Sequence, residues 1–201
     1  GILKVIQWLS EKGHDSQWLV EEGIHEVEIE GTSKWPQDPY TIRCAPQLLG
    51  AVWDQFAYAY EVIETEMNAA SDNPTFFPEE RKILHGGNFN GQHLSFVGDM
   101  MTQAIVYLGV YAERRIARLT DPSLNLGLPT YMVHEKMGLN SGFMGAQVTA
   151  SALVAQLRSL ATPLAVQSIP TNNNNQDIVS MGTLTCLRGY QCLELLFQIL
   201  A

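Results

Sequence analysis

The chain has 201 residues, of which 46% are hydrophobic and 16% are charged. Intrinsic disorder is excluded, because disordered chains combine low hydrophobicity with high charge. Acidic residues outnumber basic ones by 21 to 12, and the net charge of −9 argues against a nucleic-acid binder, whose affinity comes from clustered lysine and arginine.

One short strand and two long helices are predicted in the first two thirds of the chain. Residues 24–29 alternate apolar and polar side chains, which indicates a short strand. A helix is expected over residues 46–70, because Pro46 suits a first helical turn and apolar residues then recur every three or four positions. A second helix is expected over residues 88–119 and should end before Asp121-Pro122.

Two further helices are predicted after these. One covers residues 141–161 and is rich in glycine and alanine, which let neighbouring helices approach closely. The other begins at Gln176 or Val179 and runs to the end of the chain. Long helices, short Gly/Pro connections and little alternation predict an all-α long-helix bundle, with residues 1–201 as a single helical domain.

The last part of the chain is poor in charge. Between residues 137 and 201 the charged residues are Arg158, Asp177, Arg188 and Glu194. Helices so apolar should be buried on several sides, as happens when long helices pair with helices of other subunits. We therefore expect the chain to associate with further copies of itself.

Cysteine usage and the start of the chain bear on its location and completeness. Cys44, Cys186 and Cys192 are too few for a disulfide scaffold and favour the reducing cytoplasm. No apolar run reaches the length of a membrane span. The sequence starts with neither an initiator methionine nor a signal peptide, so we expect a fragment of a longer chain.

Metal chemistry is not expected from the histidine and cysteine positions. No two histidines have the spacing of a helical metal pair with a nearby acid, and His134-Glu135 lacks the second histidine of the zinc-protease pattern. Cys186 and Cys192 are six positions apart, which matches no zinc-site spacing. We expect no metal site.

Three polar segments interrupt the apolar pattern, and the first is Gln37–Cys44. It combines an amide, a phenol and a guanidinium. Arg43 could hold a carboxylate through two parallel hydrogen bonds. A structural ion pair of Arg43 with Asp38 or Asp54 is the alternative interpretation.

The other two polar segments are His85–Phe89 and Asn172–Asp177. The first lacks the Lys-Ser/Thr of a phosphate loop, and its two glycines indicate a turn before a helix. The second either caps the last helix or hydrogen-bonds a polar ligand. Because it contains no nucleophile, we expect binding there rather than chemistry.

Five segments, in this order, resemble the aromatic amino acid ammonia-lyases (histidine, phenylalanine and tyrosine ammonia-lyases) and the related aminomutases. They are Gln37-Asp38-Pro39-Tyr40 with Arg43; Ser71-Asp72-Asn73-Pro74; Gly86-Gly87-Asn88-Phe89; Gly127-Leu128-Pro129; and Ser168-Ile169-Pro170-Thr171 with Asn175-Gln176-Asp177. The resemblance covers about three quarters of the chain, and residues 1–35 carry no such signature.

The resemblance implies an all-α homotetramer whose active sites are shared between subunits. It also implies a prosthetic group, 4-methylideneimidazol-5-one (MIO), formed from an Ala-Ser-Gly tripeptide. These 201 residues contain no Ala-Ser-Gly. The chain is thus expected to be the central part of such a carbon-nitrogen lyase, with the tripeptide outside it, and to be inactive alone.

The resemblance also assigns roles to individual residues. Arg43 matches the arginine that holds the substrate carboxylate, and Tyr40 matches a catalytic tyrosine implicated in orientation and proton handling. The other substrate-binding positions are two amides of the same pocket, an aromatic wall and a polar pair on the opposite rim. They are Gln37 and Asn73; Phe89; and Asn175 with Gln176.

The substrate implied is an aromatic L-amino acid, which loses ammonia to give the 2,3-unsaturated acid. Gln176 stands where histidine lyases typically carry a glutamate, so phenylalanine or tyrosine is favoured over histidine. Residues 141–144 resemble histidine lyases, which keeps a histidine ammonia-lyase open. An aminomutase giving the β-amino acid and a catalytically dead helical assembly module also stay open.

Overall fold

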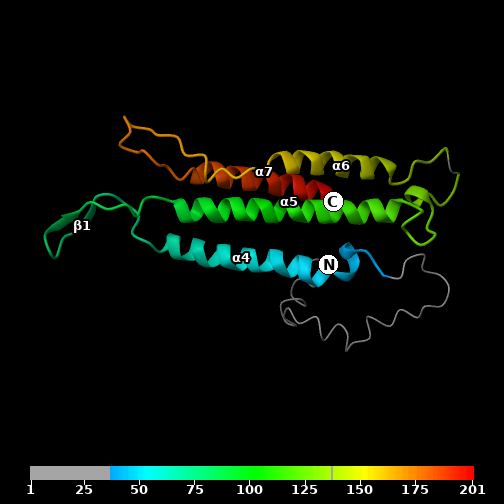
Figure 1. Cartoon of the computed structure of the whole chain (residues 1–201), viewed down its shortest axis with the longest axis horizontal. Helices are drawn as coiled ribbons and strands as arrows, with labels where there is room; N and C mark the ends of the chain where they lie inside the picture. Colours follow the sequence, from blue (N-terminus) through cyan, green and yellow to red (C-terminus); the bar gives the residue numbers. More distant parts are fainter. Residues whose placement is uncertain (1–36, 137) are drawn as a thin grey trace, which may run out of the picture. The chain divides into compact units, whose positions relative to one another are not determined.

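The computed structural model describes residues 37–136 and 138–201 (Figure 1). The strand expected at residues 24–29 lies outside the described residues. The chain divides into two compact units. Unit 1 takes in the described residues through Asp54 together with Tyr111–Ala150, and unit 2 takes in Gln55–Val110 and Ser151–Ala201.

The described residues are mostly helical, which confirms the all-α prediction. In chain order, and with the labels of Figure 1, the elements are α3 (Tyr40–Arg43), α4 (Ala45–Met67), β1 (Thr75–Phe77), β2 (Lys82–Leu84), α5 (Gln92–Thr120), η1 (Thr130–Met132), α6 (Met144–Ser159) and α7 (Gly182–Leu200). None of these helices is long and apolar enough to cross a membrane.

Three of the predicted helices begin later than expected: the third starts at Met144 rather than residue 141, and the other two start late for local reasons. The second predicted helix starts at Gln92 rather than residue 88, because the Gln92 amide donates to the Asn90 side chain at 3.1 Å, and asparagine is a favoured residue at helix starts. The fourth starts at Gly182 because Met181 is left-handed, with φ 58°, and a left-handed residue cannot continue a right-handed helix.

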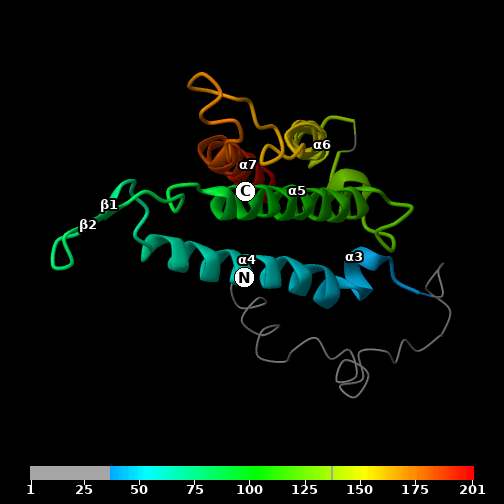
Figure 2. The same ribbon diagram turned by 60° about the vertical axis from the view of Figure 1, so that its left-hand side comes forward.

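The strands β1 and β2 form a hairpin that the sequence interpretation missed. They pair antiparallel, with Phe76 opposite Ile83, and a turn closed by Arg81 N–H and Pro78 C=O joins them. Aromatic and β-branched residues favour strands, but three residues are too few to show an alternating pattern. Figures 1 and 2 show this hairpin extending beyond the ends of α4 and α5.

Within unit 2, glycines on α5 allow close packing of its neighbours. A methyl group on Gly98 would lie 2.6 Å from the Thr185 hydroxyl of α7, and Thr185 is fully buried. A methyl on Gly109 would overlap the Leu157 side chain of α6. Both views show α5 and α7 side by side (Figures 1 and 2).

A buried carboxylate in unit 2 fixes the connection between α6 and α7. Asp99 of α5 is 7% exposed and accepts hydrogen bonds from the backbone amides of Leu164 at 2.8 Å and Ala165 at 2.6 Å. Gln92 also donates to the Ala165 carbonyl, at 3.4 Å. These bonds hold residues 164 and 165 against α5, just before the loop of residues 168–181 begins.

Within unit 1, α5 fixes the short helix α3. The Tyr111 hydroxyl donates to the Thr41 carbonyl at 2.9 Å, and an Arg118 Nη2 lies 3.9 Å from an Asp38 carboxylate oxygen. The predicted Gln37–Cys44 polar segment is therefore attached to this long helix at two points.

Candidate functional site

Tyr40 and Arg43 lie on one turn of helix. The single-turn helix α3 begins after Pro39 and contains both residues, three positions apart, so their side chains share a face. The Arg43 Cζ lies 4.8 Å from the centroid of the Tyr40 ring. This cation–π contact places the guanidinium over the ring without using its N–H donors.

The ion pair that would have given Arg43 a structural role does not form with Asp38. The Asp38 carboxylate instead lies within 3.9 Å of Arg118, on α5. Arg43 is exposed, and so is the neighbouring Tyr40, at 66%. Both groups can reach a ligand.

The loop that carries Phe89 is held by Asn73. The Asn73 side-chain oxygen accepts the Gly86 amide at 2.9 Å, and Asp72 accepts the Asn73 amide at 2.7 Å. Asn73 and Phe89 thus belong to one loop cluster at the base of the β1–β2 hairpin. The Gly86 bond uses the Asn73 oxygen and none of the donors of its NH₂ group.

The polar run after residue 171 forms a small closed loop. Thr171 and Gln176 exchange backbone hydrogen bonds of 3.0 and 3.3 Å, and the Asn175 amide donates to the Asn172 carbonyl at 3.0 Å. The three residues at the tip have left-handed backbones, a conformation that asparagine tolerates well. They are Asn172, Asn173 and Asn174, with φ of 51°, 51° and 62°.

A side-chain hydrogen bond also closes this loop. The Thr171 hydroxyl donates to the Gln176 side-chain oxygen at 2.6 Å. Further toward the base, the Ser168 hydroxyl oxygen accepts the Val179 amide at 2.8 Å. The loop is therefore closed by hydrogen bonds at its base, although residues 171–178 are exposed.

The predicted site residues fall into two groups, one in each unit. Unit 1 holds Gln37, Tyr40 and Arg43, and unit 2 holds Asn73, Phe89, Asn175 and Gln176. All seven side chains are exposed in the described chain. The structure brings together Tyr40 with Arg43, and Asn73 with the Phe89 loop.

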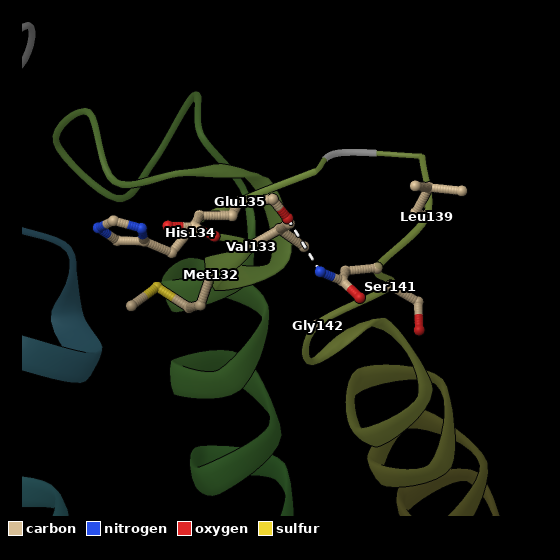
Figure 3. Close-up of a pocket in the computed structure, with 8 residues that line it drawn as sticks. Met132, Val133, His134, Glu135, Leu139, Ser141 and Gly142 are labelled. Carbon is tan, nitrogen blue, oxygen red and sulfur yellow. Dashed lines mark hydrogen bonds between the residues drawn. The ribbon is translucent and has the colours of Figure 1, made fainter.

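Sequence interpretation did not find a hollow of about 590 Å³ in unit 1 (Figure 3). It is lined by Met132, Val133, His134, Glu135, Leu139, Asn140, Ser141 and Gly142. Figure 3 shows the side chains of Met132 and His134 pointing away from those of Leu139 and Ser141. The side-chain amide of Asn140 donates a hydrogen bond to the Glu135 carbonyl at 3.0 Å, and this bond joins two parts of the lining.

The sequence signal for this hollow is weak. Gly138 and Gly142 have positive φ, 94° and 50°, and a methyl on Gly142 would collide with the Tyr131 carbonyl. Tyr131 and Met132 are also left-handed, which no residue pattern announces. The hollow gathers no pair of titratable groups suited to acid–base chemistry beyond His134 and Glu135, which are neighbours in sequence.

Among residues other than the seven predicted site residues, burial and hydrogen bonds within the fold explain the shifted pKa values. Burial raises the pKa of the Cys192 thiol, which fits a packing residue rather than a nucleophile. Two hydrogen bonds of 2.6 and 2.7 Å from Arg114 to Glu113 raise the pKa of Arg114. Over residues 37–136 and 138–201, no cluster of three histidine, cysteine or acidic side chains could hold a metal ion.

Comparisons with known proteins agree on one family. The family described as "Aromatic amino acid lyase" matches residues 2–201. A tyrosine ammonia-lyase of Cupriavidus metallidurans is 43% identical over 84% of this chain, and a histidine ammonia-lyase of Natranaerobius thermophilus is 45% identical over 82%. This chain covers 32% of each.

Solved structures give the same result. The phenylalanine aminomutase of Pantoea agglomerans matches with a TM-score of 0.80 and 32% identity, over 93% of this chain and 37% of that one. The chain therefore spans about a third of the length of the relatives that it matches.

Proposed function

Because the chain belongs to the aromatic amino acid lyase family, we propose that it is part of an ammonia-lyase that converts an aromatic L-amino acid into the 2,3-unsaturated acid. The observation that carries this proposal is the Arg43–Tyr40 pair, 4.8 Å apart on one helical turn. It sets a carboxylate-binding cation directly beside a phenol that can handle a proton.

Arg43 would hold the substrate carboxylate. Its planar fork of N–H donors matches the two carboxylate oxygens, and the contact with Tyr40 keeps the guanidinium beside the phenol. Tyr40 would then orient the substrate near its α- and β-carbons and exchange a proton there. Gln37, on the same segment, would add an amide hydrogen bond.

The family's prosthetic group, MIO, would come from an Ala-Ser-Gly segment that these 201 residues do not contain. When bound, it supplies an electrophile for the substrate amine and so makes ammonia a better leaving group. Tyr40 and Phe89 would line it, since a phenol and an aromatic ring suit a polar planar group. Their 66% and 57% exposure leaves both rings available to a segment outside the described residues.

We further propose that the chain is a section of a longer protein that assembles as a homotetramer with shared active sites. All seven candidate residues are exposed, and ligand binding gains strength only when such groups are shielded from water. Other segments and subunits would supply that shielding. A single helical domain over residues 1–201 and a cytoplasmic location, which the free cysteines favour, belong to the same proposal.

Phenylalanine or tyrosine is the proposed substrate, in preference to histidine. Gln176 would face the ring, and a neutral amide places no countercharge there for an imidazole. The histidine ammonia-lyase relatives keep a histidine substrate as the second candidate, and the aminomutase structures keep formation of a β-amino acid as another.

Replacing Gln176 in a protein of the relatives' length tests the substrate assignment. Gln176→Glu would place a carboxylate beside an apolar ring, where it would be desolvated and unpaired at a cost of several kcal/mol unless protonated. With histidine bound, the imidazole could donate to that carboxylate. We expect kcat/KM for phenylalanine and tyrosine to fall and the relative rate on histidine to rise.

The matched control is Gln156→Glu, which makes the same charge change at an exposed position of α6. It should leave the ratio of kcat/KM values across the three amino acids unchanged. A wild type that already prefers histidine, or a ratio that Gln176→Glu does not move, would remove the basis for the preference.

A further inference from the structure

We propose that Tyr111 of α5 is a positioning residue, whose hydroxyl holds the single helical turn on which Tyr40 and Arg43 lie. This inference rests on the proposed function, in which Arg43 holds the substrate carboxylate, and adds to it a residue outside the seven candidate positions. Tyr111 is 8% exposed, so it would act by placing α3 and not by touching the substrate.

The contact that carries the inference reaches the middle of α3. The Tyr111 hydroxyl donates to the Thr41 carbonyl at 2.9 Å, a normal length for an O–H···O hydrogen bond. Thr41 lies between Tyr40 and Arg43 on the same turn. Because peptide units are planar and rigid, a shift of the Thr41 carbonyl would also move the Cα atoms from which the two side chains start.

A helix as short as α3 needs support from the rest of the protein. The first turn of a helix fixes several dihedral angles for one hydrogen bond, so isolated short helices are marginal in water. Pro39, which precedes α3, makes no side-chain hydrogen bond to cap it. Tertiary contacts therefore keep α3 in place, and the Tyr111 hydroxyl supplies one of them.

The face of α5 that meets α3 is ordered around Tyr111. Tyr111, Arg115 and Arg118 are four and three positions apart, so they share one face of the helix. The Arg115 Cζ lies 5.6 Å from the centroid of the Tyr111 ring, and Arg118 lies 3.9 Å from the Asp38 carboxylate, just before α3. A long helix thus contacts the α3 segment at two points, and burial of the Tyr111 ring limits the directions its hydroxyl can take.

The test replaces Tyr111 with phenylalanine in a protein of the relatives' length. Tyr111→Phe keeps the ring and removes only the hydroxyl. Dissociation constants are compared for 3-phenylpropanoate and for 3-phenylpropanamide, which has no carboxylate for Arg43 to pair with. We expect Tyr111→Phe to lower the preference for the acid over the amide by about fivefold, the factor that corresponds to one lost hydrogen bond.

The matched control is Tyr60→Phe, which removes the hydroxyl of a tyrosine of α4 that is 67% exposed. It should leave the acid/amide preference within about twofold of wild type. A general loosening of the fold would lower the fraction of molecules that bind, or weaken the acid and the amide equally, and would leave their ratio unchanged. That result in Tyr111→Phe would overturn the inference.

Arg43→Ala, measured in the same way, separates this inference from the proposed function. If Arg43→Ala leaves the preference unchanged, Arg43 does not hold the carboxylate, and the proposed role of Arg43 fails together with the inference. If Arg43→Ala removes the preference and Tyr111→Phe leaves it unmoved, the inference alone is contradicted. In the double variant we expect Tyr111→Phe to cause no further loss of preference, because it acts through Arg43. A further fivefold loss there would show that Tyr111 acts elsewhere.

Discussion

Arg43 lies over the Tyr40 ring and Asp38 lies beside Arg118, so the Asp38 carboxylate does not occupy the N–H donors that we propose hold the substrate carboxylate. A guanidinium that neutralises a carboxylate of its own chain has fewer donors for a substrate. A guanidinium on an aromatic face keeps them all. In unit 2, the side-chain oxygens of Asn73 and Gln176 accept hydrogen bonds from the Gly86 amide and the Thr171 hydroxyl.

We expect Arg43→Ala, in a protein of the relatives' length, to lower kcat/KM by about 30-fold to several thousand-fold. Removing one partner of a desolvated charge pair costs roughly 2–5 kcal/mol, and 1.4 kcal/mol is a factor of ten. Arg43→Lys should recover only part of the activity, because one ammonium cannot replace the planar fork.

Arg158→Ala is the control for Arg43, since Arg158 is an exposed arginine in the last turn of α6. Steady-state kinetics of the three variants decides the matter. Activity of Arg43→Ala within about threefold of wild type would show that Arg43 does not hold the carboxylate.

Some residue-scale features could be predicted and others could not. The shared face of Tyr40 and Arg43 follows from their spacing of three. The hydrogen bond from the Gly86 amide to the Asn73 oxygen joins residues thirteen positions apart, on either side of the β1–β2 hairpin. No periodic pattern in the sequence reveals that contact. The hollow at residues 132–142 depends on left-handed Tyr131 and Met132, residue types that give no such signal.

At the scale of elements, close contact between α5 and α7 depends on a glycine, which has no side chain at the point of contact. Gly98 faces Thr185, which is fully buried and so has no room to move. The four long helices were predictable because their apolar residues recur with helical period. The starts of α5 and α7 were not, because Asn90 and Met181 set them through a cap and a left-handed backbone, which act over one or two residues.

We expect Gly98→Ala to lower the free energy of unfolding by about 1 kcal/mol. Overpacking costs about 1–3 kcal/mol and outweighs the gain in helix propensity from glycine to alanine, about 1 kcal/mol. Denaturant titration followed by circular dichroism measures the change. Gly145→Ala in α6, where an added methyl meets nothing within 4 Å, should be neutral or stabilising.

Equal stability of the Gly98 and Gly145 variants would mean that α5 and α7 can separate enough to admit a methyl group. The tight contact inferred at Thr185 would then be wrong.

At the scale of the whole molecule, large apolar side chains lie exposed on several helices. On α7 they include Leu187, Tyr190 and Phe197, at 61%, 64% and 62%. Scattered apolar residues are normal on surfaces, but a helix with this many fits the proposed assembly, in which further segments or subunits would cover it. The sequence anticipated this from the low charge of residues 137–201, although it could not show which side chains would be exposed.

We therefore expect the 201-residue chain to self-associate, because exposed apolar faces drive association in water. Sedimentation velocity over a range of concentrations measures its mass. A single monomeric species that also fails to bind a hydrophobic dye would contradict the inferred contacts.

The most direct test of the account follows product formation by a protein of the relatives' length that contains this chain. It is incubated separately with L-tyrosine, L-phenylalanine and L-histidine, and the unsaturated acid is measured by its ultraviolet absorbance. We expect tyrosine or phenylalanine to be deaminated with a kcat/KM above that for histidine, and the 201-residue chain alone, which lacks Ala-Ser-Gly, to form no product. Absence of unsaturated acid from all three amino acids with the longer protein, or turnover by the 201-residue chain alone, would contradict it.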